Sequence, residues 1–205
     1  MRRLVIDTAT EACSVALLQD DEVIAHVHDL LGCGHAERLI PIIAELPEGG
    51  RADEVFVDCG PGSFTGIRIG LAAAKGLGLA WSVAVRGFSV MSLIDTGAYL
   101  NNPAWRELDR AIVMEGGHGE WFVQLRGLTA NSEIKSLKPD GALEWIGARP
   151  VAGTRAELVD EMRGTGEAIH LFPDARWVGN LLPEEFLSQA SPIYSRGADA
   201  KKMVV

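Results

Sequence analysis

The segment from Gly60 to Gly70, which reads GPGSFTGIRIG, constrains the fold of this chain more than any other feature. It follows the apolar run Val55–Val57 and precedes a long stretch of small and apolar residues, 71–80. A glycine-rich turn between a predicted strand and a predicted helix exposes backbone N–H groups at the positive end of the helix, where anions bind. This order of strand, turn and helix is typical of α/β folds.

The spacing of the glycines matches none of the common phosphate or nucleophile motifs. A dinucleotide fingerprint needs glycine at the position of Thr65, and a P-loop needs a Gly-Lys-Ser/Thr sequence that the segment lacks. A nucleophile elbow around Ser63 needs glycines at the positions of Pro61 and Thr65. We therefore expect a role other than phosphate capture for this loop, and a loop or capping role for Ser63.

Small residues recur every four positions in the helix that is predicted after the turn. Each glycine inside a helix costs about 1 kcal/mol relative to alanine, so close approach of another element is expected to offset that cost. The element is either the protein's own sheet or a helix of another chain, and both alternatives stay open. The two stripes are Gly66, Gly70, Ala74 and Gly78, and Ala72, Gly76 and Ala80.

Composition and charge exclude several classes of function. The 205 residues carry a formal net charge of −9 and no cluster of Lys or Arg. Tight nucleic-acid binding depends on neutralising phosphates, so the chain alone is expected to bind RNA or DNA weakly. The apolar stretch Ile69–Val85 has a single charged residue, Lys75, and three glycines. We therefore predict a buried helix and strand there, not a membrane span, and no membrane contact.

The cysteines indicate a reducing compartment. Cys13, Cys33 and Cys59 are odd in number, have no CxxC spacing and follow no secretory segment. Such a pattern predicts free thiols in the cytoplasm.

Hydrophobic patterning predicts the same succession of elements twice. Residues 4–100 are expected to form strands and helices in the order β-β-β-α-β-α-β-α, with Ser89 capping the last helix. After Asn101–Pro103, residues 111–162 are expected to repeat β-β-β-α-β-α. This repeat suggests an α/β, actin-like (ASKHA) duplicated ribonuclease-H-like fold, whose two lobes hold mixed sheets; hydrophobic patterning alone fits other α/β arrangements as well. The first lobe covers residues 1–102, and a second, degenerate lobe with a C-terminal tail covers 103–205.

The turn after the first strand is the expected phosphate site in a fold of this type. There the usual sequence is Asp-x-Gly-Thr/Ser, whereas this chain has alanine at the glycine position, and a methyl group stands where backbone must approach phosphate. The turn is either a vestigial phosphate turn or a structural hairpin, and Gly153-Thr154 is its counterpart in the second lobe. The residues of the vestigial turn are Asp7, Thr8 and Thr10.

No catalytic or metal-binding set emerges from the remaining polar residues. His26 and His28 project from one face of a predicted strand, but no third ligand is clustered with them. His118 and Glu120 lack a paired carboxylate for acid–base work. His35 is expected to pack or to lie in an interface. We therefore expect no metal, no cofactor and no complete catalytic site on this chain.

Four segments carry a resemblance to a known family: 6–17 (IDTATEACSVAL), 35–41 (HAERLIP), 60–70, and 192–196 (PIYSR). They resemble the TsaB (YeaZ) family of bacterial tRNA threonylcarbamoyladenosine (t6A) biosynthesis proteins. The resemblance covers residues 1–90 well and is thinner from 100 to 190.

The resemblance implies a non-catalytic paralogue of TsaD, the catalytic subunit. A TsaB-type chain dimerises with TsaD, acts with the ATPase TsaE, or forms a homodimer when alone. ATP and metal then belong to the partner subunits, tRNA is met only through the complex, and the location is cytoplasmic. Arg196 and Lys201–Lys202 are the residues whose contact with tRNA stays open.

The resemblance also implies where the partner binds. In the family, two helices of the first lobe contact TsaD, and here they correspond to His35–Leu46 and Gly66–Ala80. If their side chains face outward, Gly70→Leu, Ala74→Leu and Ile42→Asp are expected to block association without unfolding the chain. The expected interface residues are His35, Leu39, Ile42, Ile43, Leu46, Gly66, Arg68, Gly70, Ala73, Ala74 and Leu77.

The chain departs from the family pattern in two places, and two alternative functions stay open. Glu115-Gly116-Gly117 replaces the family's usual Asp-Ala-Arg, and the segment Pro47–Asp53 is short. The main alternative is a small acyl or sugar kinase of the same superfold that uses Asp7 and Thr10 around ATP and Mg²⁺. A peptidase is the weaker alternative, because the chain has no evident nucleophile–base pair or metal ligands.

Overall fold

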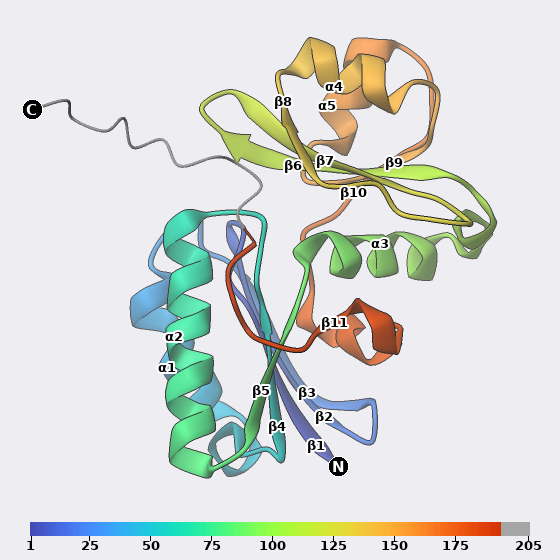
Figure 1. Cartoon of the computed structure of the whole chain (residues 1–205). Helices are drawn as coiled ribbons and strands as arrows, with labels where there is room; N and C mark the ends of the chain where they lie inside the picture. The colour runs from blue at the N-terminus through green and yellow to red at the C-terminus, as the bar shows by residue number, and fades with distance from the viewer. Residues whose placement is uncertain (194–205) are drawn as a thin grey trace, which may run out of the picture.

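The chain forms two α/β lobes, one above the other in Figure 1. The structure is a computed structural model, and it describes residues 1–193. None of the helices within that range combines the length and hydrophobicity that a membrane-spanning helix needs. The residues Tyr194, Arg196, Lys201 and Lys202, which include the end of the family-like C-terminal pattern, lie outside the described part.

The first lobe is built around a six-stranded mixed sheet with the order β11-β5-β4-β1-β2-β3. β1 pairs in parallel with β4, and β4 with β5, whereas β1, β2 and β3 form an antiparallel meander. β5 begins only at Ala84, because Ser82 adopts a left-handed conformation (φ 57°) as the C-cap of the preceding helix. The first five strands are β1 (Arg2–Asp7), β2 (Ala12–Gln19), β3 (Glu22–Leu30), β4 (Glu54–Asp58) and β5 (Ala84–Phe88).

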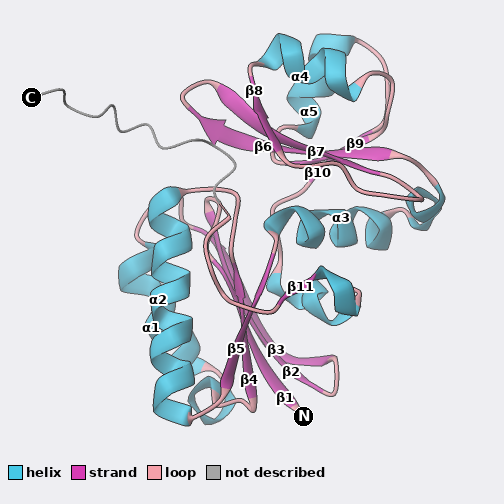
Figure 2. Cartoon of the chain, viewed as in Figure 1, coloured by secondary structure: helices cyan, strands magenta, loops and turns pink. Residues whose placement is uncertain are grey.

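Helices cover both faces of this sheet (Figure 2). Ser63 and Ser89 cap two of them through their Oγ atoms, which accept hydrogen bonds from Gly66 N and Met91 N. The capping roles predicted for both serines are confirmed. One face carries α1 (His35–Glu45) and α2 (Phe64–Trp81); the other carries α3 (Val90–Asn101) and the 3₁₀ helix η3 (Ala175–Asn180); η1 (Pro47–Gly50), η2 (Pro103–Glu107) and η4 (Pro183–Glu185) are short 3₁₀ turns.

The second lobe repeats the succession of the first, which confirms the predicted duplication. Its five-stranded sheet has the order β10-β9-β6-β7-β8, with β6 parallel to β9 and antiparallel to β7. Its core is formed by apolar side chains of the strands and the two helices. The elements are β6 (Arg110–Gly117), β7 (Glu120–Arg126), β8 (Lys135–Leu137), α4 (Pro139–Ile146), β9 (Val151–Gly153), α5 (Ala156–Arg163) and β10 (Ala168–His170).

The chain after β10 returns to the first lobe, which corrects the expected division at residue 102. Ala175 N donates to Ser14 Oγ on β2 (2.9 Å), and the strand β11 (Phe186–Leu187) adds to the edge of β5. Val178 and Leu181 are buried against the first sheet. The return is favourable because that sheet face would otherwise leave apolar side chains exposed to water. Within residues 1–193, the segment from Asp174 onward therefore belongs to the first lobe.

A buried ion pair joins the two lobes. Asp95 on α3 accepts two hydrogen bonds from Arg110 on β6, at 2.5 and 2.8 Å. Arg126 on β7 lies 3.8 Å from the same carboxylate and 3.4 Å from Glu185 in the returning segment. Asp95, Arg110 and Arg126 are all buried. The cluster therefore connects α3, the second sheet and the C-terminal part of the described chain.

Candidate functional site

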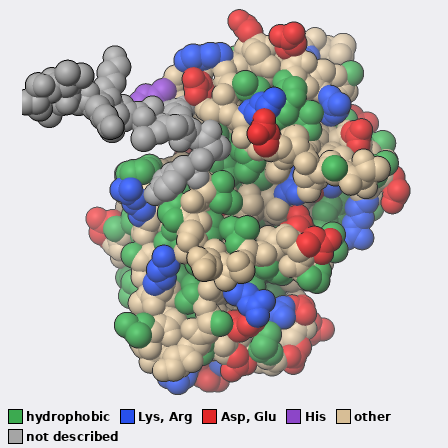
Figure 3. Space-filling model, in the orientation of Figure 1, with side chains coloured by type: hydrophobic (Ala, Val, Ile, Leu, Met, Phe, Trp, Pro, Cys, Tyr) green, Lys and Arg blue, Asp and Glu red, His purple; other side chains and the backbone are tan. Residues whose placement is uncertain are grey.

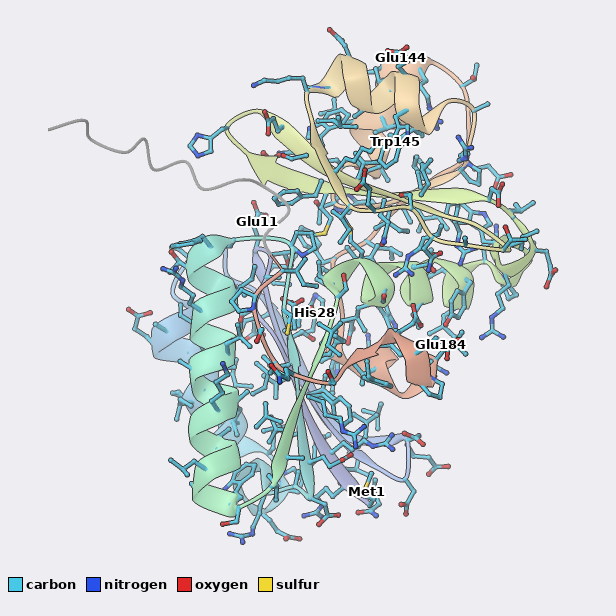
Figure 4. All side chains as sticks on the ribbon, in the orientation of Figure 1. Met1, Glu11, His28, Glu144, Trp145 and Glu184 are labelled. Atoms are coloured by element: carbon cyan, nitrogen blue, oxygen red, sulfur yellow. The ribbon has the colours of Figure 1, made fainter. Side chains whose placement is uncertain are left out.

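A cleft of about 1440 Å³ lies between the lobes. Its lower wall is made by the turn after β1 and by the N-terminal ends of α1 and α2. Its upper wall is made by the turn after β6 and by residues 170–172. Glu11, on the lower turn, lies at the end of the first lobe that faces the second (Figure 4). In actin-like proteins this is the place where nucleotide phosphates bind, so its polar groups decide the chemistry.

Three donors of the vestigial phosphate turn are engaged in hydrogen bonds within the chain. Ala9 N donates to Asp7 Oδ1 (3.1 Å), and Ala12 N donates to Thr10 Oγ1 (3.2 Å). The Thr8 hydroxyl donates to Gly66 O (2.8 Å). Because these groups are already paired, they are not free to cradle a phosphate.

The Gly60–Gly70 loop packs directly on this turn. Ser63 N donates to Ala9 O (2.7 Å), and a Cβ atom at Gly62 would lie 2.2 Å from that same oxygen. A Cβ at Gly66 would lie 2.0 Å from Thr8 O. Both distances are far shorter than any real carbon–oxygen contact, so glycine is required at these positions for the loop to approach the turn. This close approach explains the motif without an anion.

Two carboxyl groups lie beneath the turn, on adjacent strands. Asp7 ends β1 and Asp58 ends β4, and both are fully buried. Burial raises the pKa of Asp7 to about 7, with a smaller contribution from the charge of Asp174. Burial, and then the charge of Asp7, raise the pKa of Asp58 well above its ordinary value. Sequence reasoning missed Asp58, because nothing local distinguishes it from any aspartate at a strand end.

Two buried thiols and one buried histidine near the cleft are unsuited to act as a nucleophile or a base. Burial raises the pKa of Cys59 and of Cys13 to about 11, so both thiols stay protonated at neutral pH. His35 is buried, with its Nε2 3.2 Å from Ala12 O. The hydrogen bond to a backbone carbonyl fixes this ring in a packing role.

The second-lobe side of the cleft carries an exposed ion pair. Arg155 Nε donates to Glu115 Oε2 (2.6 Å), and Glu115 N donates to Thr154 Oγ1 (3.2 Å). Glu115-Gly116-Gly117, which forms the end of β6, therefore has an arginine beside it, although the arginine comes from the segment after β9. The predicted counterpart turn Gly153-Thr154 thus lies at the cleft, where it contacts the turn after β6.

His26 and His28 have a neighbour that the sequence did not indicate. Asp174, far away in the chain, places its Oδ2 3.8 Å from His26 Nε2 and 3.4 Å from His28 Nδ1. Arg176 already holds that carboxylate with two hydrogen bonds, at 2.6 and 2.9 Å, and the pKa of Asp174 is lowered despite burial. Within residues 1–193, no three His, Cys, Asp or Glu side chains are grouped as metal ligands.

The predicted interface residues face mainly inward, and this expectation needs correction. Eight of the eleven are buried in the chain's own core, Arg68 is exposed, and Ala73 and Leu77 are half-buried. Their periodicity reflects packing of α1 and α2 on the sheet: a Cβ at Gly70, for example, would lie 3.6 Å from Ile6 Cγ2. The eight are His35, Leu39, Ile42, Ile43, Leu46, Gly66, Gly70 and Ala74.

The three variants proposed from the sequence are therefore expected to unfold the chain instead of only blocking association. Gly70→Leu and Ala74→Leu would add bulk between α2 and the sheet. Ile42→Asp would place an unpaired charge in the core.

The outward surface of α1 and α2 is formed by the other stripe. Leu79 is 84% exposed, Phe64 56% and Ile40 50%, although all three are large and apolar. The Arg68 guanidinium lies over the Phe64 ring, 3.5 Å from its centre. We call this surface the outer helix face; its members are Ala36, Ile40, Ala44, Phe64, Arg68, Ala72, Gly76, Leu79 and Ala80.

The chain is an actin-like (ASKHA) protein. It has two lobes with the same strand order, a cleft between them and a phosphate-type turn after β1. The ethanolamine utilization protein EutJ from Carboxydothermus hydrogenoformans, 10% identical over 87% of both chains, shares this fold with a TM-score of 0.52. YeaZ from Pseudomonas aeruginosa is more similar: the identity is 27% and the TM-score 0.75, over 94% of this chain and 99% of that chain.

Sequence comparisons identify the family of actin-like proteins to which the chain belongs. A family model described as TsaD, tRNA N6-adenosine threonylcarbamoyltransferase, matches residues 31–133. The tRNA threonylcarbamoyladenosine biosynthesis protein TsaB of Escherichia coli is 40% identical over 149 residues, which is 68% of this chain and 64% of that protein. TsaB of Haemophilus influenzae is 38% identical over 101 residues, 47% and 42% of the two chains. The chain belongs to the TsaB (YeaZ) family, and the match spans less than two thirds of these curated relatives.

Proposed function

We propose that this chain is the non-catalytic partner subunit of a tRNA threonylcarbamoyladenosine synthesis complex, and that it binds and supports a TsaD-type catalytic subunit together with the ATPase TsaE. The observation that carries the proposal is the outer helix face. Relatives named as t6A biosynthesis proteins support the pathway. This role belongs in the cytoplasm, with tRNA contacted only through the complex and with a homodimer available to the free chain.

The outer helix face has the properties of a protein interface. Hydrophobic side chains occur along the left edge of the lower lobe, over α2, together with Lys or Arg side chains (Figure 3). A Cβ at Gly76 would meet no atom within 4 Å, so a partner helix has room to approach closely. Exposed apolar side chains around small residues favour dense helix packing at an interface core.

The cleft supports the non-catalytic part of the proposal. Three donors of the turn after β1 are used internally, and the buried thiols of Cys13 and Cys59 near it are protonated. A kinase of this superfold needs that turn open to phosphate and needs an ionised carboxylate for Mg²⁺. Here Ala9 occupies the glycine position of that turn, so a methyl group stands where the backbone must approach phosphate, which argues against the kinase alternative.

Changing the outer helix face is expected to abolish binding of the catalytic subunit. Leu79→Glu would place a charge among apolar contacts, and Gly76→Arg would fill the space that a partner helix needs. We expect each to weaken the complex with TsaD by at least about thirtyfold, since loss of an interface hot spot costs about 2 kcal/mol or more. Size-exclusion elution and calorimetric titration with purified TsaD measure this.

A matched control comes from the second lobe. Leu128 is 59% exposed and lies far from α2 in the sequence, so Leu128→Glu is expected to leave binding unchanged. All three variants should melt within a few degrees of the parent chain, because the replaced side chains are exposed. Normal binding by folded Leu79→Glu and Gly76→Arg would place the partner surface elsewhere.

The isolated chain is expected to neither hydrolyse ATP nor bind it stoichiometrically. The physical reason is the occupied hydrogen-bonding groups of the turn after β1. Calorimetric titration with Mg²⁺–ATP tests this directly. Tight one-to-one binding that is lost in Thr10→Ala would instead favour the kinase alternative.

A further inference from the structure

Asp7 and Asp58 form a side-by-side pair inside the first lobe. Ile6 and Val57 are partners in the parallel ladder between β1 and β4, and the two aspartates are the next residues on their strands. Adjacent strands lie about 4.8 Å apart, and residues at one register position project to the same face. Both carboxyls therefore lie on the face opposite to α1 and α2.

The hydrogen bonding of the two groups is incomplete in the same way. Each Oδ1 accepts one backbone N–H from two residues further on: Ala9 N at 3.1 Å and Gly60 N at 2.8 Å. Each Oδ2 is fully buried and has no hydrogen-bond partner. A buried acceptor without a donor is costly, and two neighbouring ionised carboxylates also repel each other.

We propose that Asp7 and Asp58 share one proton at neutral pH, held between their Oδ2 atoms, and that this proton stabilises the first lobe against rising pH. One O–H donor satisfies both unpaired oxygens and removes one of the two charges. The arrangement is the same in principle as other buried carboxyl pairs in which both groups cannot ionise together.

The pair lies where several parts of the chain meet. Directly after Asp58, Cys59 O accepts from Ile193 N (2.7 Å) and Gly60 O accepts from Val90 N at the start of α3 (3.1 Å). Repulsion between two ionised carboxylates at this point would loosen the loop, α3 and the returning segment together. The described titratable and charged groups around the pair are Asp174 with Arg176, His26 and His28 beyond it, and the thiols of Cys13 and Cys59.

The sign of the pH dependence follows from the raised pKa values. The ordinary pKa of an aspartate is 3.8, so above about pH 4 the unfolded chain releases a proton that the folded chain keeps. Rising pH then favours unfolding, by up to tenfold in the equilibrium constant per pH unit for one proton. His26 has the opposite effect, since burial lowers its pKa, but it is present in both proteins compared below and cancels in their difference.

The test compares the parent chain with Asp58→Asn. The amide reproduces the protonated carboxyl: its Oδ1 accepts from Gly60 N and its Nδ2 donates to Asp7 Oδ2. Between pH 5 and 7, we expect the unfolding equilibrium constant of the parent chain to rise more steeply than that of the variant, by about tenfold per pH unit. Denaturant titrations at several pH values measure both. Asp140→Asn, at an exposed carboxyl on α4, is the control and should follow the parent chain.

An infrared measurement on the parent chain tests the proton itself. In D₂O at neutral pH we expect the band of a protonated carboxylic acid, and we expect its loss in Asp58→Asn. If Asp58→Asn does not fold, Asp7→Asn takes its place in the comparison. The acid band of the parent chain then still tests whether the shared proton exists. Equal pH slopes in parent chain and variant, or absence of the acid band at neutral pH, would overturn the proposal.

Discussion

Asp95→Ala is expected to destabilise the protein by about 3–5 kcal/mol, the largest effect of any single change outside the apolar core. The carboxylate compensates Arg110 and faces Arg126, and all three side chains are buried. Removing it leaves two guanidinium groups in a low-dielectric environment without their counter-charge. The loss should appear in denaturant titrations as a lower midpoint.

A surface ion pair provides the control for Asp95. Asp29 pairs with Arg38 at 3.3 Å, and both side chains are more than a third exposed. Exposed pairs contribute at most about 1 kcal/mol, so Asp29→Ala should have little effect on the free energy of unfolding. If the two variants lose similar amounts, the buried pair does not hold the lobes together as inferred.

Gly66→Ala is expected to destabilise the chain by about 1–3 kcal/mol or more, although alanine is the better helix former. The added methyl group would lie 2.0 Å from Thr8 O, a backbone atom in a tight turn. Either α2 or the turn must move, and the Thr8–Gly66 hydrogen bond is strained in both cases. Thermal and denaturant unfolding measure the loss.

The same substitution ten residues later is expected to have the opposite sign. Gly76 lies on the outer helix face of α2, where a Cβ meets nothing within 4 Å. Gly76→Ala should therefore stabilise the free chain by about 1 kcal/mol through helix propensity alone. A loss of stability in Gly76→Ala, or none in Gly66→Ala, would contradict the assignment of inner and outer faces.

Much of the fold could be predicted because its signals are local. The caps at Ser63 and Ser89, the strand patterns and the order of elements depend on residues within one or two helical turns of each other. The duplication could be predicted because the same order of elements occurs twice along the chain. The division at residue 102 was less successful, because the return of η3 and β11 to the first sheet is a contact between distant parts of the chain.

The features of the candidate site also fall into those that the sequence predicts and those that only the fold decides. By itself, the sequence determined that α2 carries two stripes of small residues, that alanine replaces the phosphate-turn glycine, and which family the chain resembles. Only the tertiary structure decided which stripe faces the sheet, that Asp58 lies beside Asp7, and that Asp174 meets His26 and His28. The physical reason is that helical and strand periodicity arise between near neighbours. Burial, charge pairing and pKa, in contrast, depend on residues that only folding brings together.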